Sequence, residues 1–356
     1  IPFLNHLVVL LYDMEKDVKK HFKLLLMNWH NHSNNRQMPW KGEKNPYKIW
    51  LSEIILQQTR VEQGWSYYEK FIHHFPTIQD LANAKDENVF KLWEGLGYYN
   101  RCKNLLFTAR VIKDQYQGVF PKNYNDIINL KGIGNYTAAA IASFAFNLPY
   151  AVVDGNVYRV LARYAGIELP IDSNEGKKAI ASLAQELIAA DKAAAYNQAI
   201  MDFGASICKP KNPLCGTCPF QRNCKAYTEN TVSLLPVKTK KITVRKRYFN
   251  YIIVETPSHY WIEKRTDSDI WRDLHQVLLI ETDKKVSLQQ LKKQLVEKEY
   301  FKNKPELVLL KSKEQKLSHQ LIISSIYNIK INNINKSSLK KANWVPKEDI
   351  FKYAFP

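Results

Sequence analysis

Four cysteines lie close together in the chain and are candidate ligands of one metal centre. They are Cys208, Cys215, Cys218 and Cys224. The loops between them are too short to reach separate sites, so the four thiolates predict one compact centre. Soft thiolate ligands select an iron–sulfur cluster or zinc, and this spacing alone leaves both open. Such clustering argues against a secreted disulfide framework.

A glutamate on an apolar helix is a candidate acid. Glu53, Gln57 and Arg60 are separated by four and three residues, which places them on one helical face. Apolar residues occupy the rest of this helix, so a buried Glu53 would have a raised pKa and could donate a proton. The alternative is a surface ion pair between Glu53 and Arg60.

A glycine turn and an aspartate follow further along the chain. Gly132 and Gly134 form a Gly-x-Gly turn before an alanine-rich helix, whose first backbone N–H groups can bind a phosphate. Asp154 follows two valines and precedes Gly155. It is a candidate catalytic carboxylate, although an aspartate in this position can simply cap the next helix.

The elements that must position these residues change in type along the chain. Residues 13–228 predict nearly continuous helix without strands, including helices at 45–63, 98–117, 136–147, 175–190 and 193–207. Residues 229–247 are basic and predict an exposed linker. The remainder predicts strands at 248–255, 259–264, 276–282 and 306–311, with helices at 287–300 and 346–353. The second half is therefore expected to be α+β.

The charge balance favours a polyanionic partner such as nucleic acid. Basic residues outnumber acidic ones by 52 to 34, which gives a net charge of +18, with +7 on residues 1–228 and +11 on residues 229–356. Apolar runs fall short of the roughly 18 residues of a membrane span, and no signal peptide is expected. Because the chain begins with Ile1, its natural start is expected elsewhere, with Met14 as one candidate.

Taken together, the motifs resemble the endonuclease III superfamily of DNA glycosylases, and most closely its MutY-type adenine DNA glycosylases. The matching runs are Met38–Trp40, Glu53–Val61, Trp93–Tyr99, Gly132–Ser143, Val153–Val160, Asn197–Gly204, Leu235–Lys238 and Trp344–Pro346. The resemblance covers about residues 30–356. It implies a multidomain α and α+β chain. An all-α helix-hairpin-helix glycosylase core (1–228) carries an iron–sulfur module (208–224), and a linker (229–247) leads to a Nudix-like α+β domain (248–356).

The resemblance also implies chemical roles. The four cysteines would bind a [4Fe–4S] cluster. Glu53 would be the general acid, Asp154 would stabilise the sugar cation, and Tyr136 and Asn156 would orient these two groups. Bifunctional relatives carry a lysine at the position of Tyr136, whose amine forms a Schiff base and then cleaves the strand. Tyrosine predicts a monofunctional enzyme.

Further residues would contact DNA according to the resemblance. Those expected to enter the base stack are Gln58 and Tyr98, and those expected to line an adenine pocket are Arg36, Met38, Trp40 and Gln198. Gly132 and Gly134 would hold the backbone phosphate. Ser318 and His319 would read 8-oxoguanine on the opposite strand. Plain core packing is the alternative for Met38 and Trp40, and a strand edge without DNA contact is the alternative for Ser318 and His319.

The function implied is excision of adenine paired with 8-oxoguanine or guanine in base excision repair, leaving an abasic site. The expected partner is double-stranded DNA with such a mispair. A monomer in a bacterial cytoplasm, associated with the nucleoid and not with a membrane, is expected. The alternatives are a bifunctional endonuclease III-like lyase and a catalytically dead DNA-binding relative.

Overall fold

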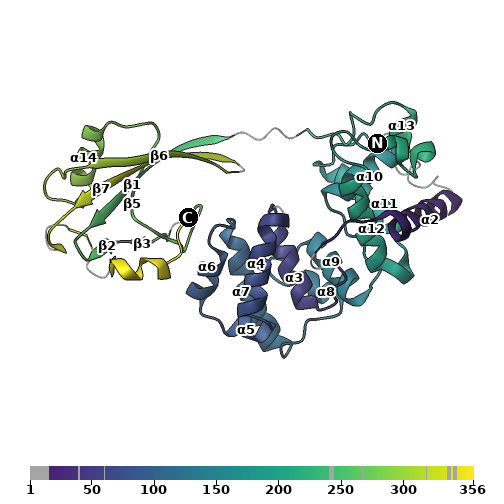
Figure 1. The fold of residues 1–356 in the computed structure, drawn as a ribbon, viewed down its shortest axis with the longest axis horizontal. Helices are drawn as coiled ribbons and strands as arrows, with labels where there is room; N and C mark the ends of the chain where they lie inside the picture. The colour runs from purple at the N-terminus through teal and green to yellow at the C-terminus, as the bar shows by residue number, and fades with distance from the viewer. Residues whose placement is uncertain are drawn as a thin grey trace. The chain divides into compact units, whose positions relative to one another are not determined.

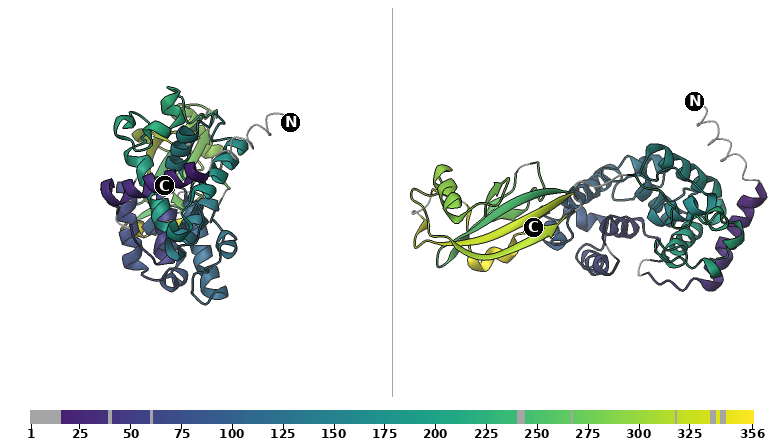
Figure 2. Two further views of the ribbon diagram at one scale, coloured as in Figure 1. Left: turned by 90° about the vertical axis from the view of Figure 1, so that its right-hand side faces the viewer. Right: turned by 90° about the horizontal axis from the view of Figure 1, so that it is seen from above.

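The computed structural model (Figure 1) describes residues 16–38, 41–59, 61–239, 244–266, 268–317, 319–334, 338–339 and 343–356. Figure 2 shows the same ribbon from two other sides. The chain divides into two compact units, Ile1–Asn83 with Lys103–Lys240, and Ala84–Cys102 with Lys241–Pro356. Trp40 and Ser318, both predicted to contact DNA, lie outside the described residues.

The first part of the chain is helical, as the sequence predicts. Its α-helices are α2 (Lys16–Ser33), α3 (Pro46–Leu56), α4 (Val61–His74), α5 (Ile78–Asn83), α6 (Asp86–Trp93), α7 (Tyr99–Gln115), α8 (Tyr124–Ile128), α9 (Asn135–Phe146), α10 (Gly155–Ala165), α11 (Asn174–Leu187), α12 (Ala193–Ser206) and α13 (Lys225–Thr228). Short 3₁₀ turns are η1 (Ala190–Lys192), η2 (Cys215–Thr217) and η3 (Gln221–Asn223). Between residues 16 and 228, the described residues contain no strand.

The predicted helix at 45–63 is wrong in its length. It begins as expected, because the Asn45 side chain accepts hydrogen bonds from the backbone N–H groups of Tyr47 and Lys48, and Pro46 occupies the first helical position. It ends at Leu56 because Gln58 has a φ of 57°. This left-handed backbone cannot continue a right-handed helix.

Two groups of helices build the first unit (Figure 1). In one group, α2, α10, α11 and α12 share an apolar core that includes Phe22, Leu161, Ile180 and Phe203. In the other, α3 packs on α4 and α9, and α9 also packs on α8. Residues between the two groups, including Arg36, Met38, Val153 and Asp154, line the cavity described below.

The second unit contains a six-stranded sheet. Its strands are β1 (Arg245–Glu255), β2 (His259–Trp261), β5 (Leu278–Thr282), β6 (Val308–Lys316), β7 (Gln320–Lys330) and β8 (Trp344–Pro346), and they follow the order β6-β7-β1-β2-β8 with β5 also on β1. A two-stranded sheet pairs β3 (Glu263–Lys264) with β4 (His275–Gln276). Helix α14 (Leu288–Glu297) is capped by Ser287, and the 3₁₀ turn η6 spans Lys347–Lys352.

The α+β character of this half is confirmed, but strand β7 was not predicted. It runs parallel to β1 from the pair Arg245↔Gln320 to the pair Glu255↔Lys330. Its own sequence alternates poorly, because Ser324 and Ser325 interrupt the apolar pattern. Among the described residues, the helices are all too short or too polar to cross a bilayer.

Candidate active site

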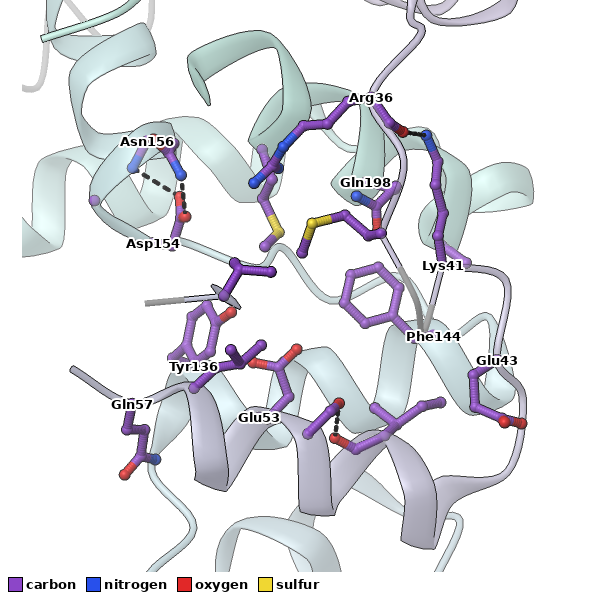
Figure 3. A pocket seen from close by; sticks show the side chains of 18 of the residues that line it. Arg36, Lys41, Glu43, Glu53, Gln57, Tyr136, Phe144, Asp154, Asn156 and Gln198 are labelled. Carbon is purple, nitrogen blue, oxygen red and sulfur yellow. Dashed lines mark hydrogen bonds between the residues drawn. The ribbon is translucent and has the colours of Figure 1, made fainter. Parts of the chain in front are cut away.

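A cavity of about 780 Å³ in the first unit collects most of the predicted site residues. It is lined from α3, α9, α10, α12 and the segment around residues 36–44 (Figure 3). The predicted residues on its walls are Arg36, Met38, Glu53, Gln58, Tyr136, Asp154, Asn156 and Gln198. The structure therefore gathers both carboxylates and most of the expected pocket residues around one space.

Glu53 is a buried acid on α3. Its exposed fraction is 8%. Burial raises its pKa, a hydrogen-bonding interaction with Tyr136 lowers it and the charge of Asp154 raises it, and together they bring the pKa to about 7. A carboxyl group with this pKa is partly protonated at neutral pH, which is the state that a general acid needs. The surface ion pair considered for Glu53 does not describe this buried side chain.

Tyr136 is positioned beside Glu53 by the first turn of α9 (Figure 3). Burial and the nearby carboxylates of Glu53 and Asp154 raise the pKa of its hydroxyl well above the usual value. Tyr136 therefore keeps its proton and can donate a hydrogen bond to Glu53. A protonated phenol cannot form the Schiff base that an amine forms with the sugar in strand-cleaving relatives.

Asp154 both caps a helix and faces the cavity. Its Oδ1 accepts hydrogen bonds of 2.8 Å from the backbone N–H groups of Asn156 and Val157. Its Oδ2 accepts one of 2.7 Å from the Asn156 side chain. Burial raises the pKa of Asp154 overall, although these donors and Arg159 act to lower it. Asp154 can therefore be both a helix cap and a candidate catalytic carboxylate, since the capping hydrogen bonds hold its carboxylate at the cavity.

Arg159 supports this carboxylate, and sequence reasoning missed it. Its Nη2 donates to Asn156 Oδ1 at 2.8 Å and to the Gly204 carbonyl at 2.7 Å. Its Nε donates to the Cys208 carbonyl at 2.7 Å. Gly204 permits this packing, because a Cβ there would lie 2.6 Å from Asn156 Cβ. The only sequence signal was the position of Arg159 one helical turn after Asn156.

Two residues predicted to enter the base stack have unusual backbone conformations. Tyr98 has a φ of 50° and is 47% exposed, and Gln58 likewise lies in the left-handed region. Such conformations are uncommon for residues other than glycine and cluster at functional sites. Gly132 has a φ of 82°, and a Cβ there would lie 2.6 Å from Asn104 Cβ. Gly134 is the N-cap of α9.

The four clustered cysteines line one small cavity beside Arg163. The Arg163 guanidinium donates to Cys208 Sγ at 3.5 Å and to the Lys209 carbonyl at 2.8 Å. Burial raises the pKa of Cys218 to about 12. Four thiolates at this place would therefore need a positive centre between them. Among the described residues, no three His, Cys, Asp or Glu side chains converge closely enough to hold a single metal ion.

His319 lies in the second unit, in the turn between β6 and β7. The turn is closed by a hydrogen bond of 2.7 Å from Leu317 N to the Gln320 carbonyl, and the His319 carbonyl accepts from Arg245 N at 3.0 Å. Arg247 also holds this turn, since its Nη1 donates to Gln320 Oε1 at 3.0 Å. The backbone of Leu317, His319 and Gln320 is therefore held by hydrogen bonds, and His319 is one of the two residues predicted to read the opposite base.

The raised pKa of Glu53 predicts a pH-dependent stability. Between its ordinary pKa of 4.5 and its folded value of about 7, the native state binds more protons than the unfolded state. The contribution of protonated Glu53 to the free energy of unfolding is therefore complete below pH 4.5 and is lost as the pH rises through about 7. The difference in unfolding free energy between Glu53→Gln and the parent protein should therefore change by about 3 kcal/mol in favour of the variant as the pH rises from about 4 to about 9.

Denaturant unfolding at several pH values measures this difference. The matched control is Glu43→Gln, which changes another carboxylate of the same cavity. Burial alone would raise the pKa of Glu43, but backbone N–H groups of Lys44 and Asn45 donate to it and lower the pKa overall. The control should show no such gain above pH 6. An equal pH dependence in both variants would contradict the assignment of a raised pKa to Glu53.

Comparison with known proteins agrees with this site. Residues 51–191 match the model of the HhH-GPD superfamily base excision DNA repair proteins. The chain is 38% identical over 253 residues to an adenine DNA glycosylase of Buchnera aphidicola (from Acyrthosiphon pisum), covering 71% of this chain and 72% of that protein. It is 38% identical over 226 residues to the human adenine DNA glycosylase, covering 60% of this chain and 41% of that protein.

Solved structures show the same helical fold. A thermostable thymine-DNA glycosylase superimposes with a TM-score of 0.54 at 31% identity, covering 59% of this chain and 97% of that one. A non-covalent endonuclease III–DNA complex gives 0.51 at 20% identity, covering 60% and 97%, and supports the fold alone. The cavity contains two carboxylates, and the sequence similarity extends over most of the length of an adenine DNA glycosylase. The chain therefore belongs to the adenine DNA glycosylase family of helix-hairpin-helix base excision repair proteins.

Proposed function

We propose that this protein excises adenine mispaired with 8-oxoguanine or guanine, by hydrolysing the N-glycosidic bond and leaving an abasic site in double-stranded DNA. The observation that carries the proposal is a pair of carboxyl groups in one cavity, the buried Glu53 and the half-buried Asp154, with burial raising the pKa of Glu53 to about 7. Adenine cannot be reached inside a duplex, so it must be flipped out of the stack into this cavity.

The two carboxyl groups suit the two needs of the reaction. Breaking the bond produces an oxocarbenium-like sugar, which requires a proton on the leaving base and an anion near the sugar. Glu53 supplies the proton to the imidazole ring of adenine. Asp154, whose backbone donors favour its charged form, stabilises the sugar cation. Tyr136 orients Glu53, and Asn156 orients Asp154 through its hydrogen bond of 2.7 Å.

Tyr136 supports a reaction without strand cleavage. A lyase step needs an amine that forms a Schiff base with the sugar, and Tyr136 supplies a protonated phenol in the corresponding place. The test is a panel of labelled duplexes with each base opposite 8-oxoguanine. The adenine strand should be cut only after alkali treatment. A cut without alkali, or a covalent adduct trapped by borohydride, would overturn the monofunctional assignment.

The four cysteines support a [4Fe–4S] cluster. They line one cavity, their burial disfavours free thiolates, and Arg163 supplies a hydrogen bond to Cys208 Sγ. When bound, the cluster would supply soft Lewis-acid iron centres that neutralise the thiolates and hold residues 208–224 in place. Arg159 would then fix Asn156 against this module, because it also donates to the Cys208 carbonyl.

Metal analysis tests the cluster directly. The purified protein should be brown and should contain about four irons per chain. Cys218→Ser should lose colour and iron together, because it removes one of four ligands, while Cys102→Ser should keep both, since Cys102 lies outside the cluster cavity. A colourless protein with one zinc per chain would contradict the assignment.

The second unit supports recognition of the opposite base. Adenine carries no lesion, so the specificity must come from 8-oxoguanine on the other strand. We assign this reading to a Nudix-like domain at residues 248–356, through Ser318 and His319. His319 belongs to the turn that Arg247 holds through Gln320. Its ring N–H can donate a hydrogen bond to the 8-oxo oxygen or a neighbouring phosphate.

A double substitution tests this assignment. Ser318→Ala with His319→Ala should reduce the preference for adenine opposite 8-oxoguanine over adenine opposite guanine by about 1–3 kcal/mol. The ratio of single-turnover rates on the two duplexes gives this number. His259→Ala, which changes a histidine of β2, is the control and should leave the ratio within about twofold. An unchanged ratio in the double variant would place the recognition elsewhere.

A further inference from the structure

A buried aspartate on α12 connects the walls of the proposed adenine pocket. The Asp202 side chain is fully buried. Its Oδ1 accepts hydrogen bonds from Arg36 Nη1 at 2.8 Å and from Gln198 Nε2 at 2.9 Å. Its Oδ2 accepts from Asn34 Nδ2 at 2.9 Å and from Lys41 Nζ at 3.1 Å. The two oxygens of this carboxylate therefore accept four hydrogen bonds in total.

The carboxylate is charged and is bonded to residues of the pocket wall. Burial alone would raise the pKa of Asp202, but the donors from Asn34, Arg36 and Lys41 lower it overall. Arg36, Lys41 and Gln198 all line the cavity that contains Glu53, as Figure 3 shows. Asn34 further donates to His30 Nδ1 at 3.0 Å. Asp202 thus fixes the irregular segment around Arg36 against α12.

The carboxylate also fixes which end of the Gln198 amide points away from it. A carboxylate only accepts hydrogen bonds, so the amide must turn its Nε2 to Asp202 and its Oε1 to the other side. Arg36 bonds to the same carboxylate oxygen, and both side chains line the cavity. One buried anchor therefore holds a glutamine acceptor and an arginine with further N–H donors on the wall of this cavity.

We infer that Asp202 is a positioning residue that sets the specificity for adenine over 6-oxopurines. It does so by holding a Gln198 acceptor and Arg36 donors against the edge of the flipped base. Adenine offers a 6-amino donor next to the N1 acceptor, which complements this pair. Hypoxanthine offers the reverse, a 6-oxo acceptor next to an N1–H donor, and would leave both protein groups mismatched. The inference rests on the proposed excision of adenine.

The test compares adenine with hypoxanthine, each opposite 8-oxoguanine in an otherwise identical duplex, by single-turnover base release. Asp202→Asn keeps the shape but turns one acceptor oxygen into a donor, so the Gln198 amide is no longer fixed. The adenine-to-hypoxanthine rate ratio should fall at least about tenfold. The control is Ser206→Ala, since Ser206 Oγ donates to the main-chain carbonyl of Asp202 and not to its carboxylate. This control should keep the parent ratio.

A rescue distinguishes positioning from a general structural role. Adding Gln198→Glu to Asp202→Asn lets the new amide at position 202 donate to the new carboxylate at position 198, whose other oxygen again faces the base as an acceptor. The ratio should recover most of its loss. If Asp202→Asn does not fold, Gln198→Leu decides, because it keeps the Asp202 hydrogen bonds to Arg36, Asn34 and Lys41 and removes the acceptor.

The outcomes separate the inference from the proposed function. A parent protein that releases no adenine removes both. If the parent protein releases adenine but Asp202→Asn leaves the adenine-to-hypoxanthine ratio unchanged, the inference is wrong and the proposed function stands. The same conclusion follows from an unchanged ratio in Gln198→Leu if Asp202→Asn does not fold. A reduced ratio that the double variant fails to restore would also overturn the positioning role.

Discussion

Replacing Glu53 with glutamine is expected to slow adenine release by about 10²- to 10⁴-fold, which is the usual contribution of a general acid. Glutamine keeps the shape of the side chain and can still interact with Tyr136, but it cannot donate the proton that the leaving base requires. The burial that raises the pKa of Glu53 to about 7 is what makes this proton available at neutral pH. Single-turnover base release on a duplex with adenine opposite 8-oxoguanine measures the effect.

Binding should survive the same substitution. The dissociation constant for the lesion duplex should stay within about tenfold of the parent value, since the uncharged amide removes no contact with the DNA backbone. Glu43→Gln provides the comparison, because Glu43 lines the same cavity but has a lowered pKa and is ionised at neutral pH. It should retain activity within about tenfold. Near-parental release by Glu53→Gln would remove Glu53 from the acid role.

Asp154→Asn should lose about 10²- to 10³-fold in rate, because a neutral amide cannot balance a sugar cation in a buried cavity. Asparagine is as good a helix cap as aspartate. The variant should therefore keep the stability of α10, because its side-chain oxygen can still accept hydrogen bonds from the first backbone N–H groups of this helix, as Asp154 does. Rapid base release and thermal unfolding, measured on the same sample, separate the two roles of this residue.

A second cap serves as the control for Asp154. Ser173 caps α11 by accepting a hydrogen bond of 2.9 Å from Gly176 N, away from the cavity. Ser173→Ala should cost about 1 kcal/mol of stability and leave the rate unchanged. If Asp154→Asn loses less than about tenfold, or roughly 1.4 kcal/mol of activation free energy, Asp154 is only a cap.

The candidate catalytic residues could be predicted from the sequence because each belongs to a short motif with its own local geometry. Glu53 follows from the period of its helix, and Asp154 follows from its place before a helix that it caps. The resemblance added the roles of Tyr136 and Asn156, and the structure places both beside these carboxylates. What could be predicted was therefore local in the chain.

The missed features depend on contacts between distant parts of the chain. A buried arginine such as Arg159 has no local signature, and only the fold brings it to the carbonyl groups of Gly204 and Cys208. Asp202 collects donors from residues 34–41 in the same way. Strand β7 is stabilised by its parallel pairing with β1, which its own apolar pattern does not reveal.

The release of free adenine as a function of pH tests the central claim most directly. One duplex, with a single adenine opposite 8-oxoguanine, is incubated with excess protein between about pH 5.5 and pH 9, and the released base is identified by chromatography. The account predicts about one adenine per duplex and an intact strand. It also predicts a rate constant that falls above pH 7 by up to about tenfold per pH unit, as Glu53 loses its proton. No free adenine at any pH, or a rate that stays level or rises above pH 7, would contradict the account.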